Sequence, residues 1–135
     1  MQELKRHALE IKYKAAMSCF SIIRFITDHM DELPAPIIRQ LVENNDIPCT
    51  LVPMLEMKPW LRTNTKGETE KWEDSKWIHV PENETQRLTK IEAQIWLTIY
   101  NIFLSSSAGR TYEITSFRKD TLLRLRKFMN EVLID

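Results

Sequence analysis

The sequence is poor in glycine and cysteine, and it carries no net charge. Gly67 and Gly109 are its only glycines, so it lacks the glycine-rich loops that cradle phosphates. Its only cysteines are Cys19 and Cys49, which cannot form a cysteine-rich zinc site. We expect buried free thiols, with a single disulfide as the alternative. Basic and acidic residues number 19 each. The sequence therefore lacks the basic excess that is typical of nucleic-acid-binding proteins, and we expect no nucleic-acid partner.

Signals for secretion, membrane insertion and catalysis are also missing. Residues 1–10 are charged throughout, and no stretch approaches the ~20 apolar residues of a membrane span. The three histidines (His7, His29 and His79) share no metal-ligand spacing, and none is placed to activate Cys49. We therefore expect no enzymatic activity, cofactor, metal, small-molecule substrate or membrane contact.

A single domain, residues 1–135, is predicted, and it begins with a long helix over residues 2–31. Apolar residues recur there at three- or four-residue steps: Leu4, Ala8, Ile11, Ala15, Ile22, Ile26 and Met30. The half from Ala15 to Ile26 is apolar on nearly every side, so we expect other helices to cover it. Asp28, Asp31 and Glu32 at its end form either a solvated terminus or an acidic contact patch.

Two proline-marked helices are predicted next. Pro36 fits the first turn of one, with an inward stripe of Ile37, Ile38, Leu41 and Val42. Pro48 opens the other. Pro53 lies inside it and removes a backbone hydrogen bond, so we expect a kink or a short helix.

The segment 58–87 is an aromatic, hydrophilic insert that holds three of the four tryptophans. A loop is expected around Gly67, and a short hairpin around Asp74 and Ser75. Trp60 follows a helix directly, so we expect it to pack back on the helices. Trp72 and Trp77 either dock in the same way or include an exposed anchor for a partner.

A fourth helix begins at a predicted capping box, with Thr89 as N-cap and Glu92 three residues on. Apolar residues cover most of its circumference, so we expect a central, buried helix in which Trp96 is structural. Its polar line is Gln94, Thr98 and Asn101, which we expect to be buried and satisfied by backbone. The stretch from Ser105 to Gly109 is expected to end it.

Thr115 or Ser116 is predicted to cap a basic last helix. Its expected inward residues are Leu122, Leu125, Phe128, Met129, Val132 and Leu133. The pairs Asp120–Arg124 and Lys127–Glu131 favour a solvated face. The alternative is contact with an acidic partner through Arg118, Lys119 and Arg126.

These elements predict an all-α fold, either a helical bundle or an armadillo-like stack, with one tryptophan-bearing loop or hairpin insert. Armadillo domains grip peptides with a Trp and an Asn one helical turn apart. Trp96 and Asn101 are five residues apart, about 140° around a helix, so that groove is not expected here.

Several segments, in this order and at these intervals, are similar to one known family. They are Met1–Leu4, Ile22–Asp28, Ile47–Cys49, Leu55–Glu56, Pro59–Trp60, Ser75–Trp77, Leu88–Lys90, Gln94–Trp96, Tyr100–Asn101, Thr115–Phe117 and Leu122–Arg126. The set resembles the middle region of the zinc finger MYND domain-containing protein ten family. The resemblance covers essentially the whole chain.

That family comprises cytoplasmic factors that pre-assemble axonemal dynein arms in ciliated cells. The resemblance implies a non-enzymatic adaptor or scaffold that works with Hsp90-type chaperone machinery on dynein chains. The family's MYND finger needs a Cys/His cluster that two cysteines cannot supply, so we expect an excised internal domain, with zinc only in the missing finger. The alternative is a generic helical interaction domain that binds a peptide or a partner helix. A Cys/His finger downstream in the parent chain would separate the two.

Overall fold

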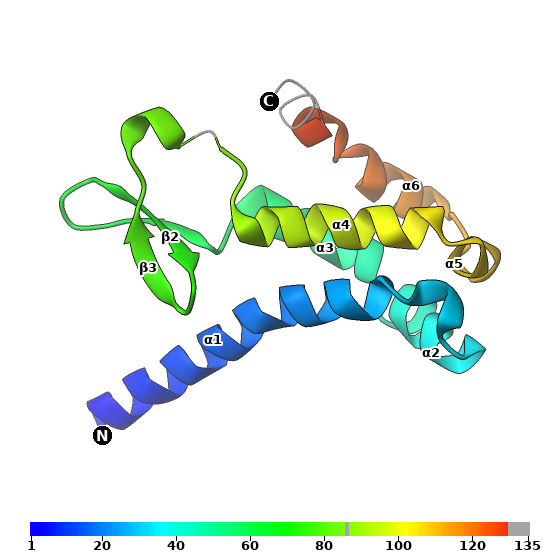
Figure 1. Ribbon diagram of the computed structural model, residues 1–135, viewed down its shortest axis with the longest axis horizontal. Coiled ribbons are helices and arrows are strands. Elements are labelled where there is room, and N and C mark those ends of the chain that lie inside the picture. The colour runs from blue at the N-terminus through cyan, green and yellow to red at the C-terminus, as the bar shows by residue number, and fades with distance from the viewer. Residues whose placement is uncertain (86, 130–135) are drawn as a thin grey trace.

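The computed structural model describes residues 1–85 and 87–129 and shows a mostly helical molecule with one small sheet (Figure 1). Its helices are α1 (Gln2–Thr27), α2 (Ala35–Arg39), α3 (Ile47–Met57), α4 (Lys90–Leu104), α5 (Ser106–Thr111) and α6 (Ser116–Leu123). Shorter helical turns are η1 (Met30–Glu32), the π-helical η2 (Gln40–Asn44) and η3 (Glu82–Glu84). The strands are β1 (Leu61–Thr63), β2 (Thr69–Glu73) and β3 (Lys76–His79). The helical prediction is confirmed, but the sheet makes the strictly all-α assignment wrong.

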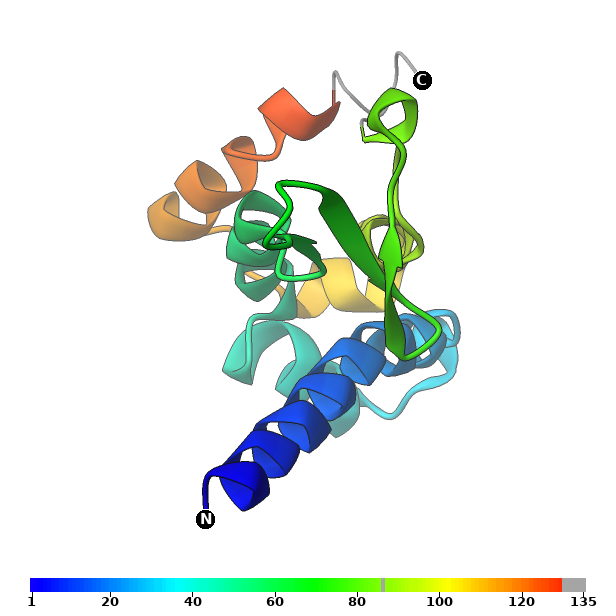
Figure 2. The ribbon, with the colours of Figure 1, turned by 90° about the vertical axis from the view of Figure 1, so that its left-hand side faces the viewer.

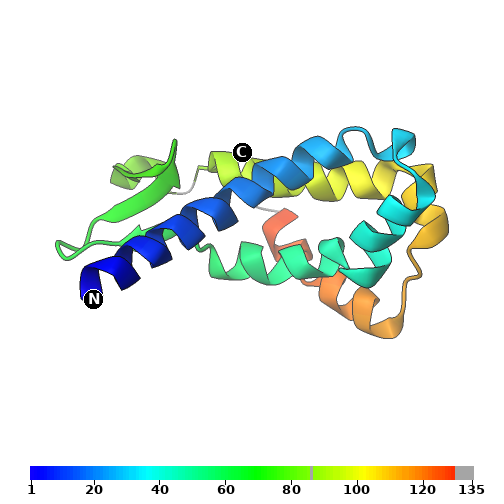
Figure 3. The same cartoon turned by 90° about the horizontal axis from the view of Figure 1, so that it is seen from below.

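The helices form two pairs, and in each pair the two helices run in the same direction. Arg24 of α1 bonds Gln94 of α4, and Asp28 bonds Asn101 further along both helices, so α1 and α4 are parallel. The α3 and α6 helices make the second pair, on the other side of α4 (Figures 1 and 3). The sheet lies at the end where α4 begins, and α5 lies at the opposite end (Figure 1).

The α1 helix differs from its prediction in how much of it is covered. It ends at Thr27, followed by the short turn η1. Its first turns extend away from the other elements (Figures 1 and 2). Leu4 is 73% exposed and Ile22 54% exposed, so the periodic apolar residues of this helix largely face solvent. The prediction that other helices surround Ala15–Ile26 is wrong, because α4 packs on only one side of α1.

The α2 and α3 helices follow the predicted proline pattern. Ile38 and Val42 are buried, whereas Ile37, which we expected to point inward, is 45% exposed. Asp46 caps α3 and has a left-handed backbone, with φ of 44°. The α3 helix is short, with 11 residues, and contains Pro53 in its interior as predicted.

The insert folds into an antiparallel sheet of order β1-β2-β3 (Figure 2). The β1–β2 loop contains Gly67 with φ of +79°, a conformation that glycine adopts without strain. Asp74 and Ser75, with φ of 54° and 62°, join β2 to β3. Two successive residues of positive φ are typical of the tight turns that match the twist of a hairpin. The predicted loop and hairpin are both confirmed.

The α4 helix begins where predicted, but it is not fully buried. The Thr89 side chain accepts a hydrogen bond from the Glu92 backbone N–H, as a capping box requires. The other half of the box is used differently, since the Glu92 carboxylate accepts from the indole of Trp60. Ser105 ends α4 and caps α5, so Gly109 lies in a further helix rather than in a loop.

The α6 helix is capped by Thr115 as predicted but is shorter than expected. Residues 124–125 form a turn, and helical structure resumes at 126–129. Leu125 is buried and Phe128 half-buried, whereas Met129 is 46% exposed. The predicted inward residues Val132 and Leu133 lie outside the described residues, as does Glu131.

Two clusters of buried side chains make the core. One joins α1, α3 and α4 around Trp60: Met17, Leu51, Val52, Leu55, Trp60, Ile95, Ile99 and Leu125. The other fills the α2–α5 end: Met30, Ile38, Val42, Ile102, Ala108 and Tyr112. Trp60 is completely buried, and its indole N–H donates to Glu92 Oε1 over 3.0 Å. Its packing on the helices was predicted. Trp96 is only half-buried at the edge of the first cluster, so it is less central than expected.

Substituting the two tryptophans should therefore have unequal effects. Trp60→Ala removes a fully buried ring and leaves the Glu92 carboxylate without its indole donor, so we expect a loss of about 3–5 kcal/mol in unfolding free energy. Trp96→Ala should cost less. Urea denaturation of both variants measures this difference. An equal or larger loss for Trp96→Ala would show that the core is centred elsewhere.

Candidate interaction surfaces

Trp72 and Trp77 dock on α1 through Tyr13. They lie opposite each other on β2 and β3, with ring centroids 5.4 Å apart. The Tyr13 ring meets Trp72 edge-on at 4.8 Å and stacks on Trp77 at 5.7 Å. The Arg62 guanidinium lies 4.2 Å from the Trp77 ring centre, a cation–π contact. Both tryptophans are half-buried, and their role as partner anchors stays a prediction.

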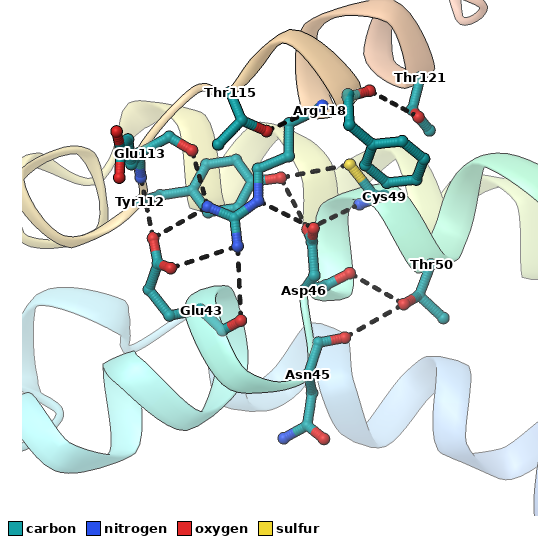
Figure 4. Close-up of polar contacts among 11 residues, drawn as sticks. Glu43, Asn45, Asp46, Cys49, Thr50, Tyr112, Glu113, Thr115, Arg118 and Thr121 are labelled. Carbon is teal, nitrogen blue, oxygen red and sulfur yellow. Dashed lines mark hydrogen bonds and ion pairs between the residues drawn. The ribbon is translucent and has the colours of Figure 1, made fainter.

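Arg118 lies at the centre of a network that ties α6 to the start of α3 (Figure 4). Its Nε donates to Asp46 Oδ2 over 3.0 Å, and its Nη1 donates to Glu43 Oε1 over 3.0 Å and to the Glu113 carbonyl over 2.7 Å. The guanidinium also covers the Tyr112 ring at 4.3 Å. The side chain is 12% exposed. Its donors therefore stabilise the fold, and its predicted role with an acidic partner is untested.

Charge and burial set the proton affinities in this network. Burial acts to raise the pKa of Asp46, but hydrogen bonds from Tyr112, the Cys49 N–H and Arg118 outweigh it and lower the pKa below the usual value. The hydrogen bond from Arg118 lowers the pKa of Glu43. Burial, and then the bond to Asp46, raises the pKa of Tyr112 strongly. The network is thus an ionised carboxylate pair held by one arginine and one neutral phenol.

The two cysteines occupy different settings. Cys49 is buried, its Sγ lies 3.3 Å from the Tyr112 hydroxyl, and burial raises the pKa of its thiol. A raised pKa disfavours the thiolate, which is the nucleophilic form. Cys19 is exposed on α1, so the expectation that both thiols are buried is wrong for Cys19. Within residues 1–85 and 87–129, no group of three or more His, Cys, Asp or Glu side chains could hold a metal ion.

The remaining predicted basic residues, Lys119 and Arg126, are exposed. Their neighbours Arg124 and Lys127 both pair with Glu56 of α3, so Arg124 turns toward α3 rather than toward Asp120 as expected. The predicted Lys127–Glu131 pair lies outside the described residues. Lys119 and Arg126 are therefore the part of the predicted basic site that faces solvent.

The acidic end of α1 fastens that helix to α4. The Asn101 amide donates to Asp28 over 2.7 Å, and the Ser105 hydroxyl donates to Asp31 over 2.7 Å. The hydrogen bond from Asn101 lowers the pKa of Asp28. Thr98 bonds the backbone as predicted, whereas Gln94 and Asn101 bond α1 side chains. Asp28 and Asp31 are thus inter-helix contacts at the rim of a hollow of about 290 Å³.

The outer side of α4 is an apolar surface that the sequence analysis missed. One side of the helix bonds α1, and another packs Ile95, Ile99 and Ile102 in the core. The third side is exposed and consists of Leu97 (43%), Tyr100 (60%), Phe103 (48%) and Leu104 (66%). We call these four residues the α4 face. No charged residue occurs between Ala93 and Leu104, so the α4 face is uncharged along its length.

One sequence signal could have revealed the α4 face. A helix that is apolar all round needs neighbours on every side. Among the described residues, α1 and α3 lie along two sides of α4, and α5 packs on it where it ends, so the side with Leu97, Tyr100 and Phe103 stays exposed. Complete burial of α4 would need more neighbouring helices than the sequence predicts, so one side of it had to remain exposed.

The described part of the chain defines a mostly helical domain with an exposed apolar helix face, a kind of surface through which proteins associate. Over all 135 of its residues it is 29% identical to the zinc finger MYND domain-containing protein 10 homolog of Drosophila melanogaster. This confirms the resemblance expected from the sequence. The chain spans 29% of the length of that relative. No family model and no solved structure matches the chain.

The Asp46 network predicts a specific acid sensitivity. The pKa of Asp46 is lower when folded than when unfolded, so its stabilisation is fully present above the ordinary value of 3.8 and is lost as the pH falls through the folded pKa. The free energy of unfolding should fall between about pH 5 and about pH 2 in the wild type, and it should fall less in Asp46→Asn. Arg118→Ala should flatten the profile in the same way. Identical pH slopes in Asp46→Asn and the wild type would contradict the assignment.

Proposed function

We propose that this domain is a non-enzymatic adaptor in a cytoplasmic factor that pre-assembles axonemal dynein arms with Hsp90-type chaperones. Two observations support the proposal. All 135 residues of this chain align with part of a MYND zinc-finger protein. The α4 face is exposed and uncharged, as a docking surface for a protein partner would be. In this proposal the zinc-binding finger belongs to another part of the parent protein.

The α4 face is the observation that carries an adaptor role. Exposed apolar patches bordered by polar residues commonly mark sites of protein association. Aromatic side chains are enriched among residues that dominate binding energy, and Tyr100 and Phe103 both lie on this face. Among the described residues, no helix is both long and apolar enough to cross a bilayer.

An armadillo-like stack is the finer fold assignment, and it stays a prediction. In such a stack each helical layer contacts the next, and a further helix would cover the α4 face. A generic domain that binds a peptide or a partner helix would use the same face. Partner identity, rather than fold, therefore separates the two functions.

Affinity capture from ciliated-cell cytosol tests the proposal. The chain should retain Hsp90-type chaperones or dynein chains, identified by mass spectrometry. Tyr100→Glu should weaken that capture by about 30-fold, which corresponds to about 2 kcal/mol for a central aromatic contact. Tyr100 is largely exposed, so the melting temperature should stay close to that of the wild type.

Phe117→Glu provides the matched control. Phe117 is 71% exposed on α6, which packs on α3, and it is not part of the α4 face, so this variant adds the same charge and should keep capture intact. Specific capture of other proteins, without chaperones or dynein chains, would favour the generic interaction domain. An equal loss of capture in Tyr100→Glu and Phe117→Glu would show that the α4 face is not the binding site.

The remaining predicted partner residues give a separate test. If an acidic partner binds α6, the double variant Lys119→Glu/Arg126→Glu should weaken capture, and the loss should shrink at high salt because these side chains are exposed. Trp77→Ala should weaken capture without lowering the melting temperature if Trp77 is an anchor. If it only docks the sheet on Tyr13, the melting temperature should fall instead.

A further inference from the structure

The exposed side of α1 has the spacing of a coiled-coil seam. Seven positions of α1 alternate by four and three residues along the helix: Leu4, Ala8, Ile11, Ala15, Ser18, Ile22 and Phe25. This is the heptad pattern in which two helices interlock. We call these seven residues the α1 seam. It runs the length of α1, on the side that does not contact α4.

All seven residues of the α1 seam are exposed. Its largest members are the most open, with Leu4 73%, Ile11 68%, Ile22 54% and Phe25 59% exposed. The first turns of α1 also lie below the sheet, away from the other elements (Figures 1 and 2). Isolated helical turns are marginal in water, and packing of an apolar side supplies most of a helix's stability. The α1 seam therefore has the features of one half of an interface.

The sizes of the seam residues suit a second copy of α1 that runs in the opposite direction. The twofold axis passes between Ala15 and Ser18. In this register, each seam residue faces the residue of the other copy for which the two residue numbers add up to 33. Ala8 then faces Phe25 of the other copy, and Ile11 faces Ile22. The two small residues, Ala15 and Ser18, meet at the axis. Each large ring thus lies against a small side chain, as close packing of two helices requires.

Charge along α1 favours the same antiparallel arrangement. Lys5, Lys12 and Lys14 flank the seam in its first half, whereas Asp28 flanks it at the other end. Two further acidic residues, Asp31 and Glu32, follow within η1. A parallel pair would place the lysines of both copies together. An antiparallel pair places the basic half of each copy beside the acidic end of the other.

We propose that the α1 seam binds the α1 seam of a second copy in an antiparallel, twofold-symmetric coiled coil. Both copies contribute the same surface, as twofold interfaces require. This self-association is independent of the proposed adaptor role, which uses the α4 face. One dimer would present two α4 faces and could hold two partner molecules.

Directional disulfide crosslinking tests the proposal. The background variant is Cys19→Ser, which removes the exposed thiol and leaves buried Cys49 in place. One tagged protein carries Ala8→Cys, and a second, untagged protein carries Phe25→Cys. Mild oxidation of the mixture should give a disulfide between the two different chains. Each protein alone should stay uncrosslinked, because its own introduced cysteines lie far apart in the antiparallel pair.

Sedimentation measurements on the full 135-residue chain complete the test. The wild type should sediment as a dimer at micromolar concentration, and Ile11→Glu should sediment as a monomer with its core intact. Tyr100→Glu, on the α4 face, should remain dimeric even though we expect it to lose partner capture. A wild-type monomer would overturn the proposal, as would a disulfide formed by the Ala8→Cys protein alone, which would indicate a parallel pair.

Discussion

The burial of Trp60 is the contact on which the arrangement of this molecule depends. It lies between the end of α3 and the first strand, is completely buried, and donates its indole N–H to Glu92 near the start of α4. Its carbonyl accepts a hydrogen bond of 2.7 Å from the Trp72 N–H. One residue therefore joins α3, α4 and the sheet. The Lys58 ammonium, 3.9 Å from Glu92, adds a compensating charge to this buried carboxylate.

The position of the sheet determines which side of α1 stays open. Because Trp60 fixes β1 and β2, Trp72 and Trp77 meet Tyr13, and the Tyr13 hydroxyl donates to the Pro59 carbonyl over 2.7 Å. Further along, Asn101 and Ser105 of α4 hold Asp28 and Asp31. Contacts at two points, Tyr13 with the sheet and Asp28 with Asn101, thus set the rotation of α1 about its axis. The α1 seam and the α4 face are left outside as a consequence of these contacts.

Local signals in the sequence predicted local structure well. Thr89 and Thr115 cap helices as expected, Gly67 lies in its predicted loop, and Asp74 and Ser75 turn the hairpin. These features depend on neighbouring residues in the chain. The orientation of α1 depends instead on contacts such as Tyr13 with Trp77, 64 positions apart by residue number, which no local pattern encodes. The heptad spacing of α1 is visible in the sequence, but the sequence does not show whether that side of the helix faces the core or solvent.

The candidate surfaces were predicted less completely for the same reason. Arg118 appeared to belong to a solvated basic helix, whereas its acidic partners, Glu43 and Asp46, come from a distant part of the chain. Lys119, one residue on, is exposed. The charge pattern of one helix cannot distinguish a paired, largely buried arginine from an exposed lysine, because the difference depends on which other elements pack against the helix. The α4 face was missed because apolar residues indicate burial unless the covering elements are counted.

Hydroxyl-radical footprinting of the chain, alone and in complex with its captured partner, tests the central claim most directly. This account predicts that Tyr100 and Phe103 are oxidised readily in the isolated chain, that Trp60 is protected throughout, and that Tyr100 becomes protected in the complex. Protection of Tyr100 in the isolated chain, or oxidation of Trp60 there, would contradict the account, because the α4 face would then be covered or the sheet would not be fixed to the helices.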